Sequence, residues 1–255
     1  MPKLILAFTS YGRNLSICHR SLLSLMKPNQ TKEADKYVLT IYKDDIDNLS
    51  KNPTLMKLVL ENKLEIIIAP VDLKNNNKYY WVMQKYDQDP IILVDDDHEY
   101  KDYVIERLYE SYLKNPKCVS SLGCRIVYEG KRFAVDTFHC SDRSKFSLYE
   151  IGVPRNDLIP EGAWGSLYPP SYMFKSDLNV VFNYIRKFYE LQKHDDLVLY
   201  QIMKRNNINI VPLAQTANNK SFNLDFGIEP VSYLFNMFGM HPNSIICHDI
   251  LDLIF

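Results

Sequence analysis

Ile91-Ile92-Leu93-Val94-Asp95-Asp96-Asp97 is the stretch from which both the fold and the site can be inferred. Four consecutive apolar residues of this kind are typical of a strand that is buried on both faces. The three carboxylates that follow cannot stay in an apolar core, so the chain must leave the core there. Ligands collect at the carboxyl ends of strands in open α/β sheets. We therefore expect a functional site where this strand ends.

Three adjacent carboxylates repel one another unless a cation lies among them. Carboxylate oxygens are the ligands that Mg²⁺ and Mn²⁺ prefer, so the acidic run predicts a divalent-metal site. A structural alternative stays open at this point. Asp97 would then cap a helix that starts near Tyr100, and the other two acids would be solvated.

Strands and helices alternate along the chain before the acids. Strands are predicted at the apolar runs 3–8, 37–42 and 64–69. Helices are predicted between them at 15–26, 53–61 and 77–85. A further helix at 101–115 and strands at 118–122, 125–128 and 208–213 are expected after the acids, whereas 129–160 has no clear period. This order predicts an α/β fold with a mixed, mostly parallel sheet that helices cover on both faces.

Composition excludes several classes of protein. The 255 residues fit one large domain or one domain with a smaller appendage, and the net charge of −1 argues against a nucleic-acid partner. The five cysteines form no CxxC pair, which argues against a zinc knuckle or a disulfide framework and favours a reducing compartment. No apolar run is long enough for a transmembrane helix. We expect a cytoplasmic protein; peripheral membrane contact and the oligomeric state stay open.

Polar residues at two predicted strand ends are candidates for nucleotide contacts. The loop from Thr9 to Asn14 follows the first strand and has neither GxGxxG nor GxxxxGK[ST], so it supports neither a dinucleotide fold nor a P-loop. Arg13 could pair with a phosphate or be an ordinary surface arginine. Asp72 could accept a hydrogen bond from a nucleobase or ribose, and Lys78 is placed for a diphosphate. A turn aspartate and a solvated lysine are the alternatives.

Two later stretches carry further candidates. Gly162 and Gly165 flank Trp164, an arrangement that suits either a platform for a sugar ring or a core tryptophan between two turns. Asp195 and Asp196 open a predicted helix at 197–205, where carboxylates face the positive end of the helix dipole. A carboxylate there could also act as a general base on a hydroxyl group.

Taken in order, five segments resemble the GT-A glycosyltransferases that use nucleotide-sugar donors. They are similar to a GT2-like group of bacterial and viral polysaccharide-synthesis transferases with a "DDD" version of the DxD motif. The segments are Thr9–Tyr11, Lys78–Tyr80, Val94–Asp97, Gly162–Pro170 and His194–Asp196. The resemblance covers residues 3 to 213. It implies a single GT-A domain over 1–255, with a nucleotide-binding half at 1–115 and an acceptor-binding half at 116–255.

The resemblance also implies roles for individual residues. Asp95 and Asp97 would be the DxD carboxylates that bind Mn²⁺ or Mg²⁺, with Asp97 the most direct ligand and Asp96 nearer the donor sugar or ribose. Asp196 would be the base of an inverting reaction, with Asp195 as its substitute. Contacts with a UDP- or GDP-sugar are implied for Thr9, Tyr11 and Lys78, and the positions of Arg13 and Asp72 add these two residues to the same set. Contacts with sugar or acceptor are implied for Trp164 and Gly165. A C-terminal metal contact is expected from His241, with His248 as the alternative; either could instead be structural.

Two other functions stay open beside a metal-dependent glycosyltransferase acting on a saccharide or glycan acceptor. A sugar nucleotidyltransferase also uses paired acids and Mg²⁺, but it expects a Gly-rich, Arg-bearing loop after the first strand, which Ser10-Tyr11-Gly12-Arg13 matches poorly. A carbohydrate-binding module with a structural ion would bind sugar without binding nucleotide. The donor sugar, the acceptor and the linkage are beyond the sequence.

Overall fold

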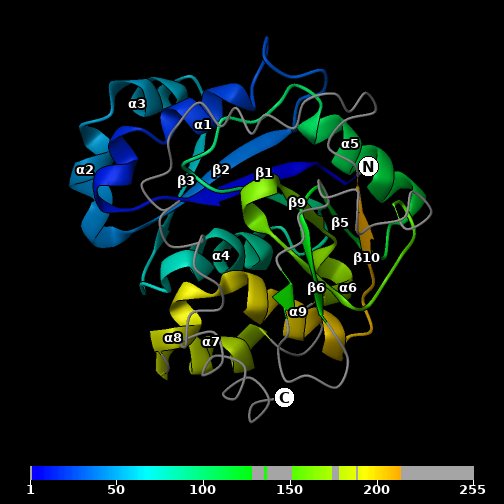
Figure 1. Ribbon diagram of the computed structural model, residues 1–255. Coiled ribbons are helices and arrows are strands. Elements are labelled where there is room, and N and C mark those ends of the chain that lie inside the picture. The colour runs from blue at the N-terminus through cyan, green and yellow to red at the C-terminus, as the bar shows by residue number, and fades with distance from the viewer. Residues whose placement is uncertain (1, 128–134, 137–150, 174–177, 188, 214–255) are drawn as a thin grey trace.

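A seven-stranded sheet lies at the centre of the computed structural model, which describes residues 2–127, 135–136, 151–173, 178–187 and 189–213 (Figure 1). Its strands are β1 (Ile5–Thr9), β2 (Lys36–Tyr42), β3 (Glu65–Ala69), β4 (Ile91–Leu93), β5 (Val119–Ser121), β9 (Ser166–Tyr168) and β10 (Ile210–Pro212). They lie in the order β10-β5-β9-β4-β1-β2-β3. β9 runs antiparallel to its neighbours β4 and β5, and the other pairs in the sheet are parallel.

Helices connect the strands. The α-helices are α1 (His19–Ser24), α2 (Ile46–Ser50), α3 (Pro53–Leu60), α4 (Asn77–Lys85), α5 (Val104–Lys114), α6 (Pro170–Met173), α7 (Leu178–Lys187), α8 (Tyr189–Lys193) and α9 (Asp195–Arg205). Short 3-10 helices are η1 (Gly12–Ser16), η2 (Lys43–Asp45), η3 (Lys74–Asn76) and η4 (Gly162–Trp164). A smaller antiparallel sheet contains β7 (Val135–Asp136), β6 (Cys124–Val127) and β8 (Leu158–Pro160).

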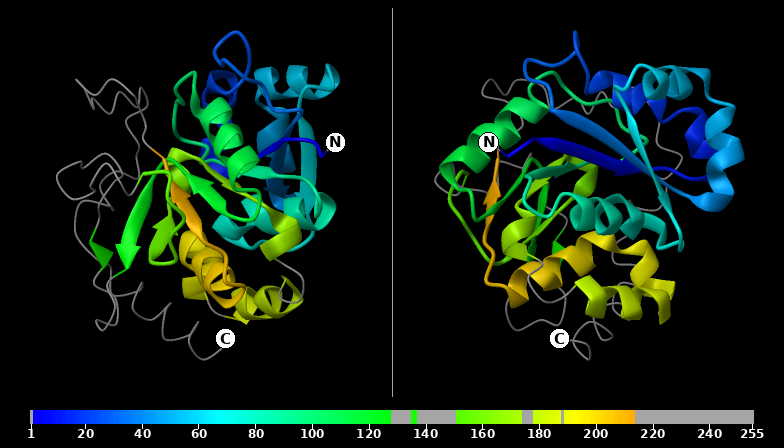
Figure 2. Two further views of the ribbon diagram at one scale, coloured as in Figure 1. Left: turned by 90° about the vertical axis from the view of Figure 1, so that its right-hand side faces the viewer. Right: turned by 180° about the vertical axis from the view of Figure 1, so that it is seen from behind.

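Alternation along β1 explains why both faces of the sheet are covered. Leu6 and Phe8 belong to the same core cluster as buried residues of α1, α3 and α5. Ile5 and Ala7 point to the opposite face and belong to the cluster that includes residues of α4 and α9. In Figure 1, α1 and α3 lie above the sheet and α4, α8 and α9 lie below it; Figure 2 shows the same layers from two other sides. The predicted α/β fold with a mostly parallel, doubly covered sheet is confirmed.

One predicted helix differs from the structure, and one strand was not predicted. A helix does lie within the predicted range 15–26, but it is shorter than predicted, because η1 covers Gly12–Ser16 and α1 runs only from His19 to Ser24. The Ser16 hydroxyl donates to the Arg13 carbonyl at 2.7 Å, a local side-chain bond that favours a turn over a continuous helix. Strand β9 was not predicted, because its three residues are too few to show a period.

No helix in the described part of the chain is long and apolar enough to span a bilayer. Most of the segment predicted to be irregular, 129–160, falls outside the described residues, as do His241 and His248. The division into two halves at residue 115 stays a prediction.

Candidate active site

The acidic run lies where the central strand β4 ends, as the sequence predicts. Val94 is still buried, and its N–H donates to the carbonyl of Ala7 on β1 at 3.2 Å. Asp96 turns toward the first loop, because the Ser10 hydroxyl donates to Asp96 Oδ2 at 2.5 Å. The Ser21 hydroxyl of α1 donates to the backbone oxygen of Asp96 at 2.8 Å. Asp96 is thereby tied to the segment that follows β1.

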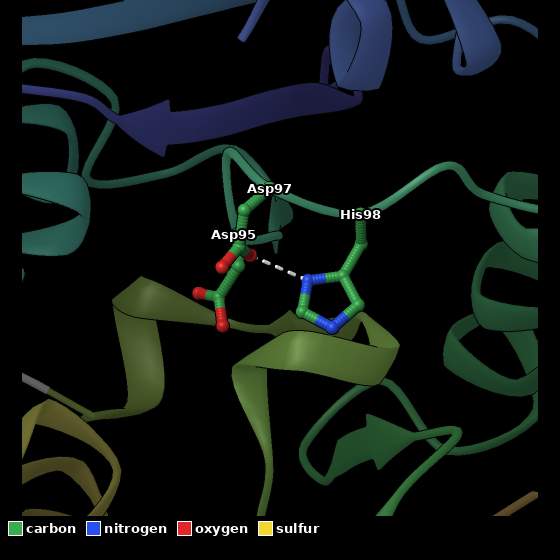
Figure 3. A group of neighbouring side chains, drawn as sticks. All are labelled: Asp95, Asp97 and His98. Atoms are coloured by element: carbon green, nitrogen blue, oxygen red, sulfur yellow. Dashed lines mark ion pairs between the residues drawn. The ribbon is translucent and has the colours of Figure 1, made fainter. Parts of the chain in front are cut away.

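Asp95 and Asp97 form a group with His98 that could hold a metal ion (Figure 3). One ligand atom from each of the three residues lies within 4.8 Å of the others, and His98 Nδ1 is 2.6 Å from Asp97 Oδ1. Two ligands of a single Mg²⁺ lie at most about 4.2 Å apart, so small side-chain rotations would bring all three within coordinating distance. The two carboxylates suit Mn²⁺ or Mg²⁺, whereas an imidazole ligand suits a transition-metal ion, so the three together favour Mn²⁺ over Mg²⁺. Sequence reasoning missed His98, although its place directly after the acids was a usable signal.

Tyr100 holds the backbone of the acidic loop in place. The Asp95 N–H donates to the Tyr100 hydroxyl at 2.8 Å, and the Tyr100 N–H donates to the Ser24 hydroxyl at 2.9 Å. The Tyr100 side chain is buried in the core cluster that includes β1, α1 and α5. The carboxylates therefore start from a backbone that packing and hydrogen bonds have already positioned.

Lys78 lies between two of the predicted acids. Its Nζ is 2.8 Å from Asp95 Oδ1 and 2.5 Å from Asp195 Oδ2. The side chains of Lys78 and Asp195 are only 6% and 8% exposed. Burial alone would lower the pKa of Lys78, but the charges of Asp195, Asp95 and Asp196 raise it well above its usual value. The ammonium group therefore stays charged, in contact with carboxylates of the acidic loop and of α9.

Gly162 completes this group from a fourth segment. Its N–H donates to Asp196 Oδ1 at 3.2 Å. A Cβ atom at Gly162 would lie 2.7 Å from Lys78 Nζ and 3.4 Å from both Asp196 Oδ1 and Asp95 Oδ1. Asp196 Oδ1 and Asp95 Oδ1 are each 3.4 Å from this position, so the two oxygens are at most about twice 3.4 Å apart. Four segments that are far apart in the sequence meet here, all of them predicted to carry functional residues.

Trp164 and Gly165 have clear packing roles. A Cβ atom at Gly123 would lie 2.1 Å from Trp164 Cδ1, so the indole ring rests directly on the Gly123 backbone. Gly165 is buried with a φ of 90°, and a Cβ atom there would lie 3.3 Å from Val104 of α5. The turn and this close approach explain glycine at position 165. Contact of Trp164 or Gly165 with a sugar stays a prediction.

The Tyr168 side chain on β9 is fully buried, and its hydroxyl has no hydrogen-bond partner among the described residues. Burial and then the charge of Asp196 raise the pKa of Tyr168 well above its usual value. Tyr168 therefore carries a neutral hydroxyl group close to the acids of α9. The sequence did not predict this placement.

The candidates for nucleotide contacts are spread over the ends of β1 and β3. Tyr11 is 49% exposed, and its pKa is raised by burial and by the charge of Asp96. Asp72 accepts from the Lys74 N–H at 2.8 Å and forms an ion pair with the Lys74 ammonium group. The Thr9 hydroxyl donates to the carbonyl of Thr40 at 2.8 Å. Arg13 is exposed on η1. Contacts of these residues with a nucleotide stay predictions.

Protonation in the acidic loop follows from burial and mutual repulsion. Burial raises the pKa of Asp96 to about 6, helped by the charges of Asp97 and Asp95 and opposed by the hydrogen bond from Ser10. Burial alone would lower the pKa of His98, but the hydrogen bond and charge of Asp97 outweigh it and raise the pKa. A metal ion would compete with the His98 proton, because imidazole ligates in its neutral form.

Comparison with known proteins gives little further information. No protein-family model matches the chain, and no curated protein sequence matches it. Solved structures do match, among them "Crystal structure of 4-diphosphocytidyl-2C-methyl-D-erythritol synthase". That structure has a TM-score of 0.48 and 10% sequence identity over 99% of this chain and 100% of the other. A similarity at this level transfers neither activity nor substrate to this chain.

Proposed function

We propose that the protein is a metal-dependent glycosyltransferase that moves a sugar from a nucleoside-diphosphate donor to a saccharide acceptor. One observation carries the proposal. Lys78, Asp95, Gly162 and the pair Asp195–Asp196 come from four distant segments, yet their atoms meet at the carboxyl end of β4. A group that merely capped a helix and faced solvent would not bring these segments together.

The residues present fit a divalent cation. Asp95, Asp97 and His98 would hold it, since their donor atoms converge. The carboxylates suit both Mn²⁺ and Mg²⁺, and the imidazole favours Mn²⁺. When bound, the ion would supply positive charge that offsets the charge developing on a departing diphosphate. Tyr100 contributes by fixing the backbone from which Asp95 projects.

Asp196 is the better of the two candidates for a general base. Asp195 is buried and paired with the Lys78 ammonium group, whereas Asp196 is partly exposed. In the proposed reaction, the acceptor hydroxyl loses its proton to Asp196 as its oxygen bonds to the anomeric carbon. The bond from that carbon to the phosphate oxygen breaks, and the nucleoside diphosphate leaves with the electron pair. Attack from the face opposite the leaving group would invert the configuration.

The first experiment is incubation of the protein with Mn²⁺, candidate UDP- and GDP-sugars and saccharide acceptors. Release of nucleoside diphosphate that depends on acceptor supports the proposal. Release of pyrophosphate from a nucleoside triphosphate and a sugar phosphate would instead identify a sugar nucleotidyltransferase. Sugar binding without any nucleotide binding would identify a carbohydrate-binding module.

Two variants separate binding from transfer, and a third is their control. We expect Asp97→Ala to abolish metal-dependent stabilisation by nucleotide in a thermal-shift assay. We expect Asp196→Asn to bind the donor normally but to lose transfer. Asp87→Ala is the matched control, because Asp87 is exposed and precedes β4, at the end of the strand away from the site. Unchanged turnover in Asp196→Asn would exclude Asp196 as the base.

A further inference from the structure

Lys78 contacts acids that belong to two different parts of the proposed machinery. Asp95 is a proposed metal ligand, and Asp195 lies in the first turn of α9 directly before the proposed base. Both carboxylates are within 2.8 Å of the same ammonium nitrogen. A change in the strength of the ion pair between Lys78 and one carboxylate therefore changes the strength of its ion pair with the other.

The ammonium group has little room to turn elsewhere. The Lys78 side chain is 6% exposed, and the added Cβ position at Gly162 lies 2.7 Å from its nitrogen. Tyr79 and Tyr80, the residues that follow Lys78, are also buried. Because the group stays charged and cannot reach solvent, losing one carboxylate partner leaves it to rely more heavily on the other.

A divalent cation on Asp95 would lie close to this positive charge. The nitrogen is 2.8 Å from Asp95 Oδ1, and a metal ligand bond adds only about 2.1 Å. Repulsion between the two cations weakens metal binding unless another carboxylate offsets the ammonium charge. Asp195, at 2.5 Å, is in direct contact with the ammonium nitrogen and is placed to do so, and Asp196 adds negative charge nearby.

We infer that Lys78 is a positioning residue that couples the metal site to α9, with Asp195 controlling how far Asp95 is available to the cation. This inference rests on the proposed function, because it requires that Asp95 binds a metal ion. It gives Asp195 a purpose other than catalysis and explains why two adjacent acids begin α9. Asp195 would tune the metal site while Asp196 would face the substrate.

The test is a double-mutant cycle on Mn²⁺ affinity, measured by isothermal titration calorimetry without any substrate. Asp195→Asn should weaken Mn²⁺ binding by about tenfold, because the ammonium group then relies on Asp95. Lys78→Met should tighten binding, since it removes the competing charge. In the Lys78→Met background, Asp195→Asn should change the affinity by less than about threefold.

Lys85→Met is the matched control. Lys85 lies on the same helix α4, but it is exposed and pairs with Glu65 instead. Its replacement should leave the Mn²⁺ affinity unchanged. Circular dichroism checks that each variant is folded. Lys78→Gln replaces Lys78→Met in the cycle if the methionine variant does not fold.

The outcomes separate the inference from the proposed function. If Asp195→Asn changes the Mn²⁺ affinity equally in the wild-type and Lys78→Met backgrounds, Asp195 acts on the metal directly through its charge and not through Lys78. That result would overturn the inference but not the proposed function. So would an unchanged affinity in Asp195→Asn, provided that Asp97→Ala abolishes binding. Failure of the wild-type protein to bind Mn²⁺ would overturn the metal site of the proposed function and the coupling with it. Non-additive effects of the two substitutions on Mn²⁺ affinity, with Asp195→Asn weakening binding only when Lys78 is present, would support both the inference and the metal site.

Discussion

Substituting Gly162 by alanine is the smallest change that perturbs the centre of the proposed site. The added methyl group would lie 2.7 Å from Lys78 Nζ, whereas an ordinary contact begins near 3.4 Å. The nitrogen must therefore move by about 0.7 Å. It cannot do so freely, because Asp95 and Asp195 hold it at 2.8 Å and 2.5 Å.

We expect the effect on function to exceed the effect on stability. A misplacement of about 1 Å in a catalytic group can reduce the rate by about 100-fold. Gly162→Ala should therefore reduce kcat/KM by about 10- to 100-fold, which corresponds to about 1.4–2.7 kcal/mol. The crowding cost is partly offset by the lower entropy of the unfolded chain, so the free energy of unfolding should change by no more than about 1 kcal/mol.

The assay compares kcat/KM for nucleoside diphosphate release with the free energy of unfolding in urea. Gly152→Ala is the matched control: its φ of 80° strains alanine, but no atom lies within 4 Å of the added Cβ. That variant should lose about 1–2 kcal/mol of stability and keep its kcat/KM. Wild-type kcat/KM in Gly162→Ala would refute the view that Lys78 and the acids around it form the working site.

Three further predictions follow from individual contacts. His98→Ala should weaken Mn²⁺ binding by about tenfold or more in calorimetry, whether the ring ligates directly or orients the neighbouring carboxylate; unchanged affinity would exclude both roles. Tyr100→Phe removes the acceptor of the Asp95 N–H and should cost about 1–3 kcal/mol in urea unfolding, along with some Mn²⁺ affinity; full stability would show that water replaces the hydroxyl. Burial alone would raise the pKa of Glu65, but its hydrogen bonds, first that from Lys36, lower the pKa below its usual value of 4.5. The ionised carboxylate therefore stabilises the folded protein when the pH is above 4.5. Glu65→Gln should therefore cost about 0.5–1 kcal/mol at pH 7, and the difference from wild type should disappear as the pH falls below that value; equal losses at pH 7 and pH 3 would contradict the ion pairing.

Much of the sheet could be predicted from the sequence, because its strands are local apolar runs. β1, β2 and β4 begin and end within about two residues of the predicted bounds, as does α4, and α5 lies within the range predicted for it. β9 could not be predicted. Its pairing with β4 and β5 is a contact between distant segments, and this pairing together with the burial of Leu167 and its neighbours stabilises a strand there.

The candidate site could be predicted as a set of segments but not as a set of contacts. The acids after β4 were recognisable because charge directly follows a buried strand. The pairing of Lys78 with Asp95 and Asp195 was not, since no local rule relates positions 78, 95 and 195. His98 could have been included, because it directly follows the three aspartates; which of its contacts would form could not be read from the sequence. The packing of Trp164 on Gly123 depends equally on a contact between distant segments.

The central claim is that the acids after β4 hold a divalent ion that also binds the diphosphate of a nucleotide. Anomalous scattering from crystals grown with Mn²⁺ and UDP or GDP tests it most directly. We predict a single strong manganese peak within coordinating distance of Asp95, Asp97 and His98, with the diphosphate oxygens completing its shell. A manganese peak elsewhere, or a nucleotide bound away from these residues, would contradict the account.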